Sequence, residues 1–208
     1  MNIASISRDR PDAAVGGSLT RAHRARVTGR ARLAAATLGI ALFAGCGGSD
    51  DPGPATGNTG NDGAGGTTES PLATETKVAI NAVRTSGRRC GQTDYPPTTA
   101  LDWSAPLEQA ALDQAIWLRD NNQFSHVGEN GSDVGNRVTA AGYAWRTVAE
   151  NIAGGQADVA AVVQAWVDSP EHCANLMTTA FRDIGLARVD GGSGNTYTSY
   201  WTLVLAAR

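Results

Sequence analysis

A run of glycine and small polar residues at 47–71 most constrains how this chain folds. It reads G-G-S-D-D-P-G-P-A-T-G-N-T-G-N-D-G-A-G-G-T-T-E-S-P and holds no large aliphatic or aromatic side chain. Such a composition buries too little apolar surface to offset the entropy of ordering the chain. We therefore predict a flexible tether at 46–71 and one folded domain after it, at 72–208.

Residues 1–45, which precede the tether, have the layout of an export signal. Seven arginines lie in the first 32 residues, and the apolar run L-A-A-A-T-L-G-I-A-L-F-A-G at 33–45 carries no charge. The run is shorter than the roughly 20 apolar residues that span a bilayer, so it is interpreted as a signal peptide. The arginine-rich part is longer than a signal requires, which leaves a start near Val27 as an alternative.

The signal ends in Leu42-Phe43-Ala44-Gly45-Cys46, which resembles the lipobox of bacterial lipoproteins. The resemblance implies cleavage before Cys46 and lipid attachment to its sulfur and new amino terminus. A plain secretory signal is the alternative. Gly47, in place of an aspartate, favours the outer membrane by analogy with Gram-negative lipoproteins. We expect an exported lipoprotein of the outer membrane or cell surface, periplasmic if it is not surface-exposed.

Cleavage at Cys46 changes the charge of the chain. Seven of the 17 basic residues but only two of the 20 acidic ones precede it, which leaves the mature chain a net charge of −8. An acidic chain without a Lys/Arg cluster argues against nucleic acid and against an electrostatic hold on anionic lipid. The lipid anchor is therefore the expected link to the membrane.

Cysteine count predicts one disulfide. If Cys46 is acylated, Cys90 and Cys173 remain as an even pair in an oxidising compartment. A nucleophilic Cys173 assisted by His172 is the alternative, but adjacent residues on a helix do not face each other.

Three side chains are candidates for chemistry. Pro170 predicts the start of a helix that Ser169 caps, which places His172 in the first turn; a histidine that serves only packing is the alternative. His126 follows the aromatic Phe124 in a loop. Glu150 lies among small apolar residues, and a buried carboxylate needs a partner, which a histidine, a metal ion or backbone amides would supply.

Apolar spacing predicts a layered α+β domain. Helical periodicity and capping residues predict helices near 74–86, 105–121, 133–141 and 158–166. Alternation predicts a hairpin of two strands near 184–189 and 196–205, separated by the glycine-rich turn at 190–195. Helices packed on a small antiparallel sheet satisfy both patterns.

Residues 72–208 resemble the CAP superfamily (cysteine-rich secretory, antigen 5 and pathogenesis-related proteins) in its bacterial, SCP-like form. The motifs that carry the resemblance are F-S-H at 124–126, A-G-Y at 141–143, A-E-N-I-A at 149–153, W-x-x-S-P-x-H-C-x-N-L-M at 166–177, I-G-L-A at 184–187 and Y-W-T at 200–202. The resemblance implies a three-layer α-β-α sandwich with a central cleft in which His126 and Glu150 face each other. It also implies the pairing of Cys90 with Cys173.

The sequence departs from the family pattern at two positions. Eukaryotic members hold a second histidine where this chain has Tyr200, and a second glutamate where it has Ser169. His172 is the nearest replacement. His126, Glu150 and His172 would form a ligand set for Zn²⁺ with an open fourth position, or a metal-free hydrogen-bonded cluster.

Two functions remain open at this stage. The favoured one is a tethered module that binds an apolar or envelope-derived ligand, because no nucleophile paired with a base is evident. The alternative is a metal-dependent, peptidase-like hydrolase, in which Glu150 is the general base for a water held at His126 and His172.

Overall fold

A computed structural model describes residues 4–8 and 69–208 of the chain. The predicted tether up to residue 68, the lipobox with Cys46 and most of the predicted signal peptide lie outside these residues. The predicted end of the tether is wrong, because Ser70 caps the first helix and Pro71 begins it. No helix in the described part is both long and apolar enough for a membrane span. The helices are α1 (Pro71–Ser86), α2 (Ala105–Asp120), α3 (Val134–Ala140), α4 (Val159–Val167) and α5 (Pro170–Met177), with a 3-10 turn, η1, at Glu129–Gly131.

The strands form one main sheet and one small hairpin. The main sheet has the order β1 (Ala4–Arg8), β5 (Thr147–Gly154), β7 (Ser199–Ala207), β6 (Asp183–Asp190), β4 (Asp102–Trp103). All its pairs are antiparallel except β4 with β6. The hairpin joins β2 (Arg88–Cys90) to β3 (Thr93–Tyr95).

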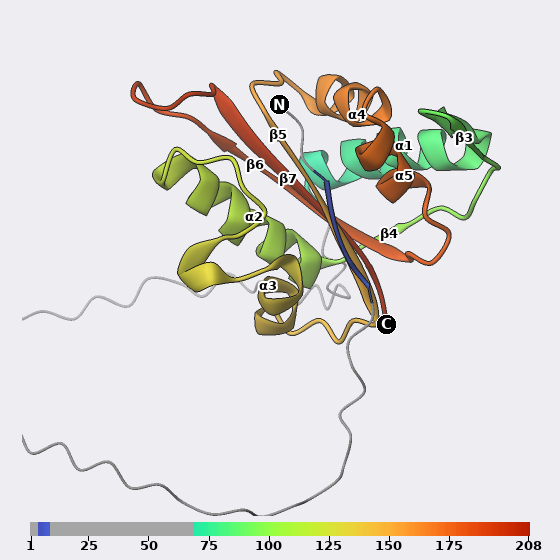
Figure 1. Cartoon of the computed structure of the whole chain (residues 1–208), viewed down its shortest axis with the longest axis horizontal. Coiled ribbons are helices and arrows are strands. Elements are labelled where there is room, and N and C mark those ends of the chain that lie inside the picture. Colours follow the sequence, from blue (N-terminus) through green and yellow to red (C-terminus); the bar gives the residue numbers. More distant parts are fainter. Residues whose placement is uncertain (1–3, 9–68) are drawn as a thin grey trace, which may run out of the picture. The chain divides into compact units, whose positions relative to one another are not determined.

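Helices cover both faces of the main sheet, so the predicted α+β sandwich of three layers is confirmed (Figure 1). Strand β7 shows why: Leu203 and Leu205 pack with α1, α4 and α5, whereas Val204 and Ala206 pack with α2 and α3. Alternate residues of a strand point to opposite faces. Two separate apolar cores result, one on each face.

The predicted disulfide between Cys90 and Cys173 is confirmed, with a Cα–Cα distance of 5.4 Å. It fastens the β2–β3 hairpin to α5. The buried guanidinium of Arg84 on α1 holds the C-terminal end of α5, where it donates to the carbonyl oxygens of Leu176 and Thr178. Helix α5 is thus fixed at its middle and at its C-terminal end.

Strand β1 lies within the segment predicted to be removed as a signal peptide. It pairs with the outer edge of β5, where Ser5 is opposite Glu150 and Ala4 is opposite Asn151. A chain cleaved before Cys46 would lack this strand. The β5 edge beside Glu150 would then have no β1 partner.

Three predicted details differ from the structure. Thr147–Gly154 was not expected to be a strand, because β5 is covered on both faces and shows no alternation. The β2–β3 hairpin, which ends just before Pro96 and Pro97, was not among the predicted elements. Ser169 does not cap α5 through its side chain.

Candidate functional site

Glu150 is the centre of the candidate site. It lies on β5, and its side chain is fully buried on the face covered by α2 and α3. Its Oε1 is 2.7 Å from Nδ1 of His126, and its Oε2 accepts a hydrogen bond of 2.7 Å from Nη2 of Arg137. Glu150, His126 and Arg137 are called the Glu150 cluster below.

The predicted approach of His126 to Glu150 is present. The loop that follows α2 carries His126, and Nε2 of Gln114 on α2 binds the carbonyl oxygen of Ser125. Because an ionised carboxylate only accepts hydrogen bonds, this contact requires the proton of the neutral imidazole on Nδ1. His126 is thereby held with one ring edge on Glu150.

Sequence analysis missed Arg137 as the second partner. It lies on α3 and is 6% exposed, and its Nη2 also donates to the carbonyl oxygen of His126. One signal was available: Arg137 follows Val134 by three residues and precedes Val138, so it lies on the apolar face of its helix. An arginine at such a position needs a buried acceptor.

The structure does not bring His172 into the Glu150 cluster. His172 is on α5, in the layer that covers the opposite face of the sheet, and its Nδ1 is 2.8 Å from Oγ of Ser169. Asn151, the residue after Glu150, faces α5 and donates from Nδ2 to the carbonyl oxygen of His172. Since neighbouring residues of a strand point to opposite faces, β5 separates the two groups.

This separation decides what chemistry the arrangement offers. Among residues 4–8 and 69–208, no three His, Cys, Asp or Glu side chains are grouped so as to hold a metal ion. The predicted ligand set of His126, Glu150 and His172 is therefore not assembled in the structure. Glu150 is also fully buried and each of its carboxylate oxygens already accepts a hydrogen bond, so a water could reach it only if the residues around it moved.

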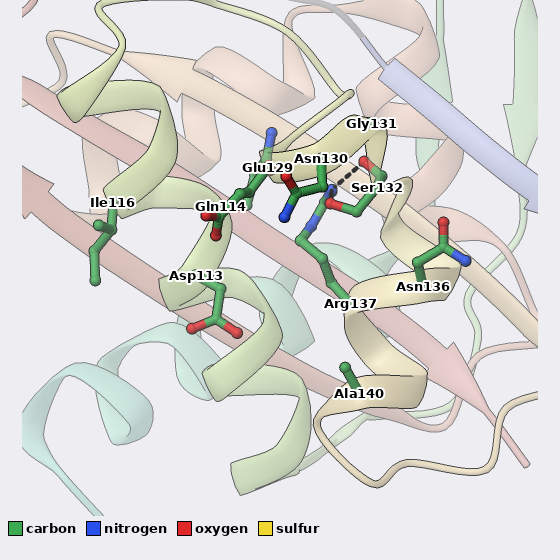
Figure 2. A pocket seen from close by; sticks show the side chains of 10 residues that line it. All are labelled: Asp113, Gln114, Ile116, Glu129, Asn130, Gly131, Ser132, Asn136, Arg137 and Ala140. Carbon is green, nitrogen blue, oxygen red and sulfur yellow. Dashed lines mark hydrogen bonds between the residues drawn. The ribbon is translucent and has the colours of Figure 1, made fainter. Parts of the chain in front are cut away.

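A pocket adjoins the Glu150 cluster (Figure 2). It lies between α2, η1 and α3, has a volume of about 530 Å³ and is called the α2–α3 pocket below. Its lining residues are Asp113, Gln114, Ile116, Glu129, Asn130, Gly131, Ser132, Asn136, Arg137 and Ala140. Arg137 thus belongs to both the pocket and the cluster, whereas neither His126 nor Glu150 lines the pocket.

Comparison with known proteins identifies related sequences. The model of the Cysteine-rich secretory protein family (CAP) matches residues 79–205. An uncharacterized protein of Bacillus subtilis (strain 168), YkwD, is 31% identical over 87 residues, which cover 42% of this chain and 34% of YkwD. The uncharacterized membrane protein YlbC of the same organism is 27% identical over 86 residues, 41% of this chain and 25% of YlbC. The chain therefore matches about a third or less of the length of these relatives.

Two solved structures are similar in part. One is an extracellular protein containing a SCP domain from Bacillus anthracis str. Ames, with 24% identity and a TM-score of 0.47 over 53% of this chain and 35% of that chain. The other is an outer surface protein from Borrelia burgdorferi, with 24% identity and a TM-score of 0.48 over 53% of this chain and 80% of that chain.

Proposed function

Because the chain belongs to the Cysteine-rich secretory protein family (CAP), we propose that it is an exported, lipid-anchored module that binds a ligand at the cell envelope. The signal, the lipobox and the tether in its sequence support export and anchoring at Cys46. The tether would hold the folded domain away from the membrane surface. The lipid is then the membrane contact, and the domain remains available for a ligand.

The α2–α3 pocket is the observation that carries the binding role. Its volume of about 530 Å³ is within the range of small-molecule sites. Its lining comes from α2, from the η1 turn and from α3, and the ion pair of Arg137 with Glu150 fixes α3 on the sheet. A rigid pocket of this kind binds a ligand without a large ordering cost.

The geometry does not favour the hydrolase. Glu150 has both oxygens occupied, and His172 lies in a different layer, so the proposed base and the two proposed imidazoles do not converge. In this account His126, Glu150 and Arg137 position α3 and the loop after α2.

A substitution at Cys46 tests the proposed anchoring. The wild-type chain should fractionate with membranes and carry the mass of a lipid on a chain that begins at Cys46. Cys46→Ser should remain uncleaved and unlipidated, and it should leave the lipid-bearing fraction. Identical fractionation and identical mass of the folded domain in both chains would contradict the proposal.

Processing should also change the β5 edge. Hydrogen exchange of the backbone amides at 147–151 should be slower in the uncleaved chain, where β1 pairs with β5, than in the cleaved chain. Amides at 200–204 on β7, which keep both neighbours, are the internal control. Equal exchange at 147–151 in both forms would show that β1 does not occupy this edge.

A further inference from the structure

Strand β1 shows that the outer edge of β5 accepts an added strand. The five residues of β1 pair with residues 147–151 in an unbroken antiparallel register, and Figure 1 draws β1 in blue along β5. The last three residues of β5, 152–154, have no partner on this side among residues 4–8 and 69–208. Because β5 has eight residues, its edge has room for a strand longer than β1.

A chain cleaved before Cys46 lacks β1, so the backbone N–H and C=O groups on this edge of β5 lose their partners. Natural sheets protect such edges with lysine, proline or a bulge. Strand β5 carries no lysine, arginine or proline, and its pairing with β7 runs without a bulge from Thr147 to Gly154. Its single charged side chain, Glu150, is fully buried and paired with Arg137. The sequence and the pairing of β5 thus contain no feature that prevents strand addition.

The surroundings of β1 favour a single extended segment over a second copy of the domain. Helix α5 lies beside β1 as well as beside β5, so it extends past the edge of the strand. Two copies joined through their β5 edges would each bring an α5 to the same face of the joined sheet, next to the other copy's strand. A single strand has no helix layers of its own, and β1 shows that it fits.

The register of β1 indicates which kind of segment fits. The four residues of β1 opposite residues 148–151 are uncharged: Ala4, Ser5, Ile6 and Ser7. An acidic residue opposite Glu150 would place two like charges across the strand pair, which is unfavourable. Proline has no N–H to donate to the edge. The fitting segment is therefore extended, free of proline and uncharged over its central residues.

We propose that the β5 edge of the processed protein binds an extended, uncharged and proline-free segment of another envelope polypeptide by antiparallel strand addition. Backbone hydrogen bonds supply the affinity, and the position opposite Glu150 selects against acidic residues. This inference rests on the proposed cleavage before Cys46, which removes β1. It names a second binding surface in addition to the α2–α3 pocket.

Binding of a fluorescent peptide to the full-length chain tests the edge without relying on cleavage. The peptide has the sequence of residues 2–9, N-I-A-S-I-S-R-D, and fluorescence anisotropy measures its dissociation constant. The parent chain carries Cys46→Ser, so β1 stays attached and competes with the peptide at a high effective concentration.

Prolines in β1 should free the edge. Adjacent residues of a strand point their N–H groups to opposite sides, so Ser5→Pro combined with Ile6→Pro removes at least one donor to β5. This double-proline chain should bind the peptide with a dissociation constant about tenfold or more below that of the parent. Ser18→Pro combined with Leu19→Pro, outside β1, is the matched control and should bind like the parent.

Peptides with methylated backbone nitrogens test whether the contact is strand addition. Alternate N–H groups of an added strand point toward β5. One peptide is methylated at Ala4, Ile6 and Arg8, and the other at Ser5 and Ser7. One of the two should bind the double-proline chain about tenfold or more weakly than the unmodified peptide, and the other within about threefold. Equal affinities of the two peptides would exclude strand addition.

The two proposals fail in different experiments. A wild-type chain that is neither cleaved nor lipidated would refute the anchored module, and the double-proline chain would still test the edge. A double-proline chain whose thermal midpoint shows that it is folded, but which has no affinity for the peptide, would overturn strand addition whatever the result of processing. A double-proline chain that dimerises in place of binding the peptide would assign the edge to a second copy and also overturn the inference.

Discussion

The Glu150 cluster and the α2–α3 pocket share Arg137, yet they differ in how completely their polar groups are paired. On the cluster side, both oxygens of Glu150 are bound, and Nη1 and Nη2 of Arg137 each donate to an acceptor. Among the residues that line the pocket, two buried atoms, Nε of Arg137 and Oε1 of Gln114, have no partner in the described part of the chain. The guanidinium of Arg137 therefore has two nitrogens, Nη1 and Nη2, that are hydrogen-bonded and one, Nε, that is not.

This difference separates a structural role from a binding role. A buried network in which every polar group is paired stabilises the fold. It is a poor site for a ligand, because the ligand would compete with the protein groups already bonded there. Two buried polar atoms without a partner cost stability instead. His126 and Glu150, which most resemble a catalytic site in the sequence, thus belong to the fully paired network.

The largest expected effect is on stability, when the cluster is broken at Arg137. Arg137→Met keeps much of the buried volume but removes the cationic partner of the buried Glu150 and leaves its Oε2 without a donor, which should lower the free energy of unfolding by about 3–5 kcal/mol. Urea unfolding measures this change in the free energy of unfolding. Arg146→Met, at an exposed arginine, is the matched control and should change the value by less than about 0.5 kcal/mol.

A double variant sharpens this result. Arg137→Met combined with Glu150→Gln removes both charges, so it should cost less than the sum of the two single variants. Strict additivity would show that the two side chains do not act as an ion pair in the native protein.

The next effect is smaller, because His126 is partly exposed. His126→Phe keeps a ring and removes the contact with Oε1 of Glu150, which should cost about 1–2 kcal/mol in the free energy of unfolding. Val127→Ala, in the same loop and 52% exposed, is the control. A His126→Phe value as small as that of the control would mean that the loop does not depend on the cluster.

The pH dependence of stability tests how α3 is held at its far end. The phenol of Tyr143, just after α3, donates to Oδ2 of Asp183, and burial, together with this bond, raises the pKa of Tyr143 well above its ordinary value. A raised pKa means that the native state favours the protonated phenol. This stabilisation is complete below about pH 10, the pKa of an unfolded tyrosine, and is lost as pH rises above it.

Unfolding in urea on both sides of that pH measures the effect. The wild-type chain should lose more stability between about pH 8 and pH 10.5 than Tyr143→Phe does, since only the wild type has this proton to lose. The same pH profile in both chains would show that the phenol is not linked to folding.

The smallest expected effect on stability is in the pocket. Glu129 is exposed and lines the pocket, so Glu129→Gln should change the free energy of unfolding by less than about 0.5 kcal/mol. Urea unfolding of the two chains measures this difference, and a loss above about 1 kcal/mol would show that the carboxylate of Glu129 supports the fold around the pocket.

Several features of the fold followed from the sequence. Helical spacing placed α1 to α4 to within a few residues, Pro170 marked the first residue of α5, and alternation placed β6 and β7. The count of cysteines gave the pair Cys90 and Cys173. The helices and strands follow from local residue patterns, and the disulfide follows from the number of cysteines. Both kinds of information are present in a single sequence.

Features that depend on the sheet were harder to predict. Strand β5 carries Glu150 and Asn151 in adjacent positions that face different layers, and no local pattern marks it as a strand. Without β5, the opposite placement of Glu150 and His172 was not visible, and the two residues were assigned to one site. Ser169 was expected to cap α5, but its hydroxyl contacts His172 instead.

The most direct test of this account is a Zn²⁺ titration of the full-length chain followed by native mass spectrometry, beside His126→Ala and His172→Ala. Because β5 separates His172 from the Glu150 cluster, we expect no stoichiometric zinc that depends on both histidines. One bound zinc ion that is lost in both variants would contradict the account, since it would require His126 and His172 to share a site.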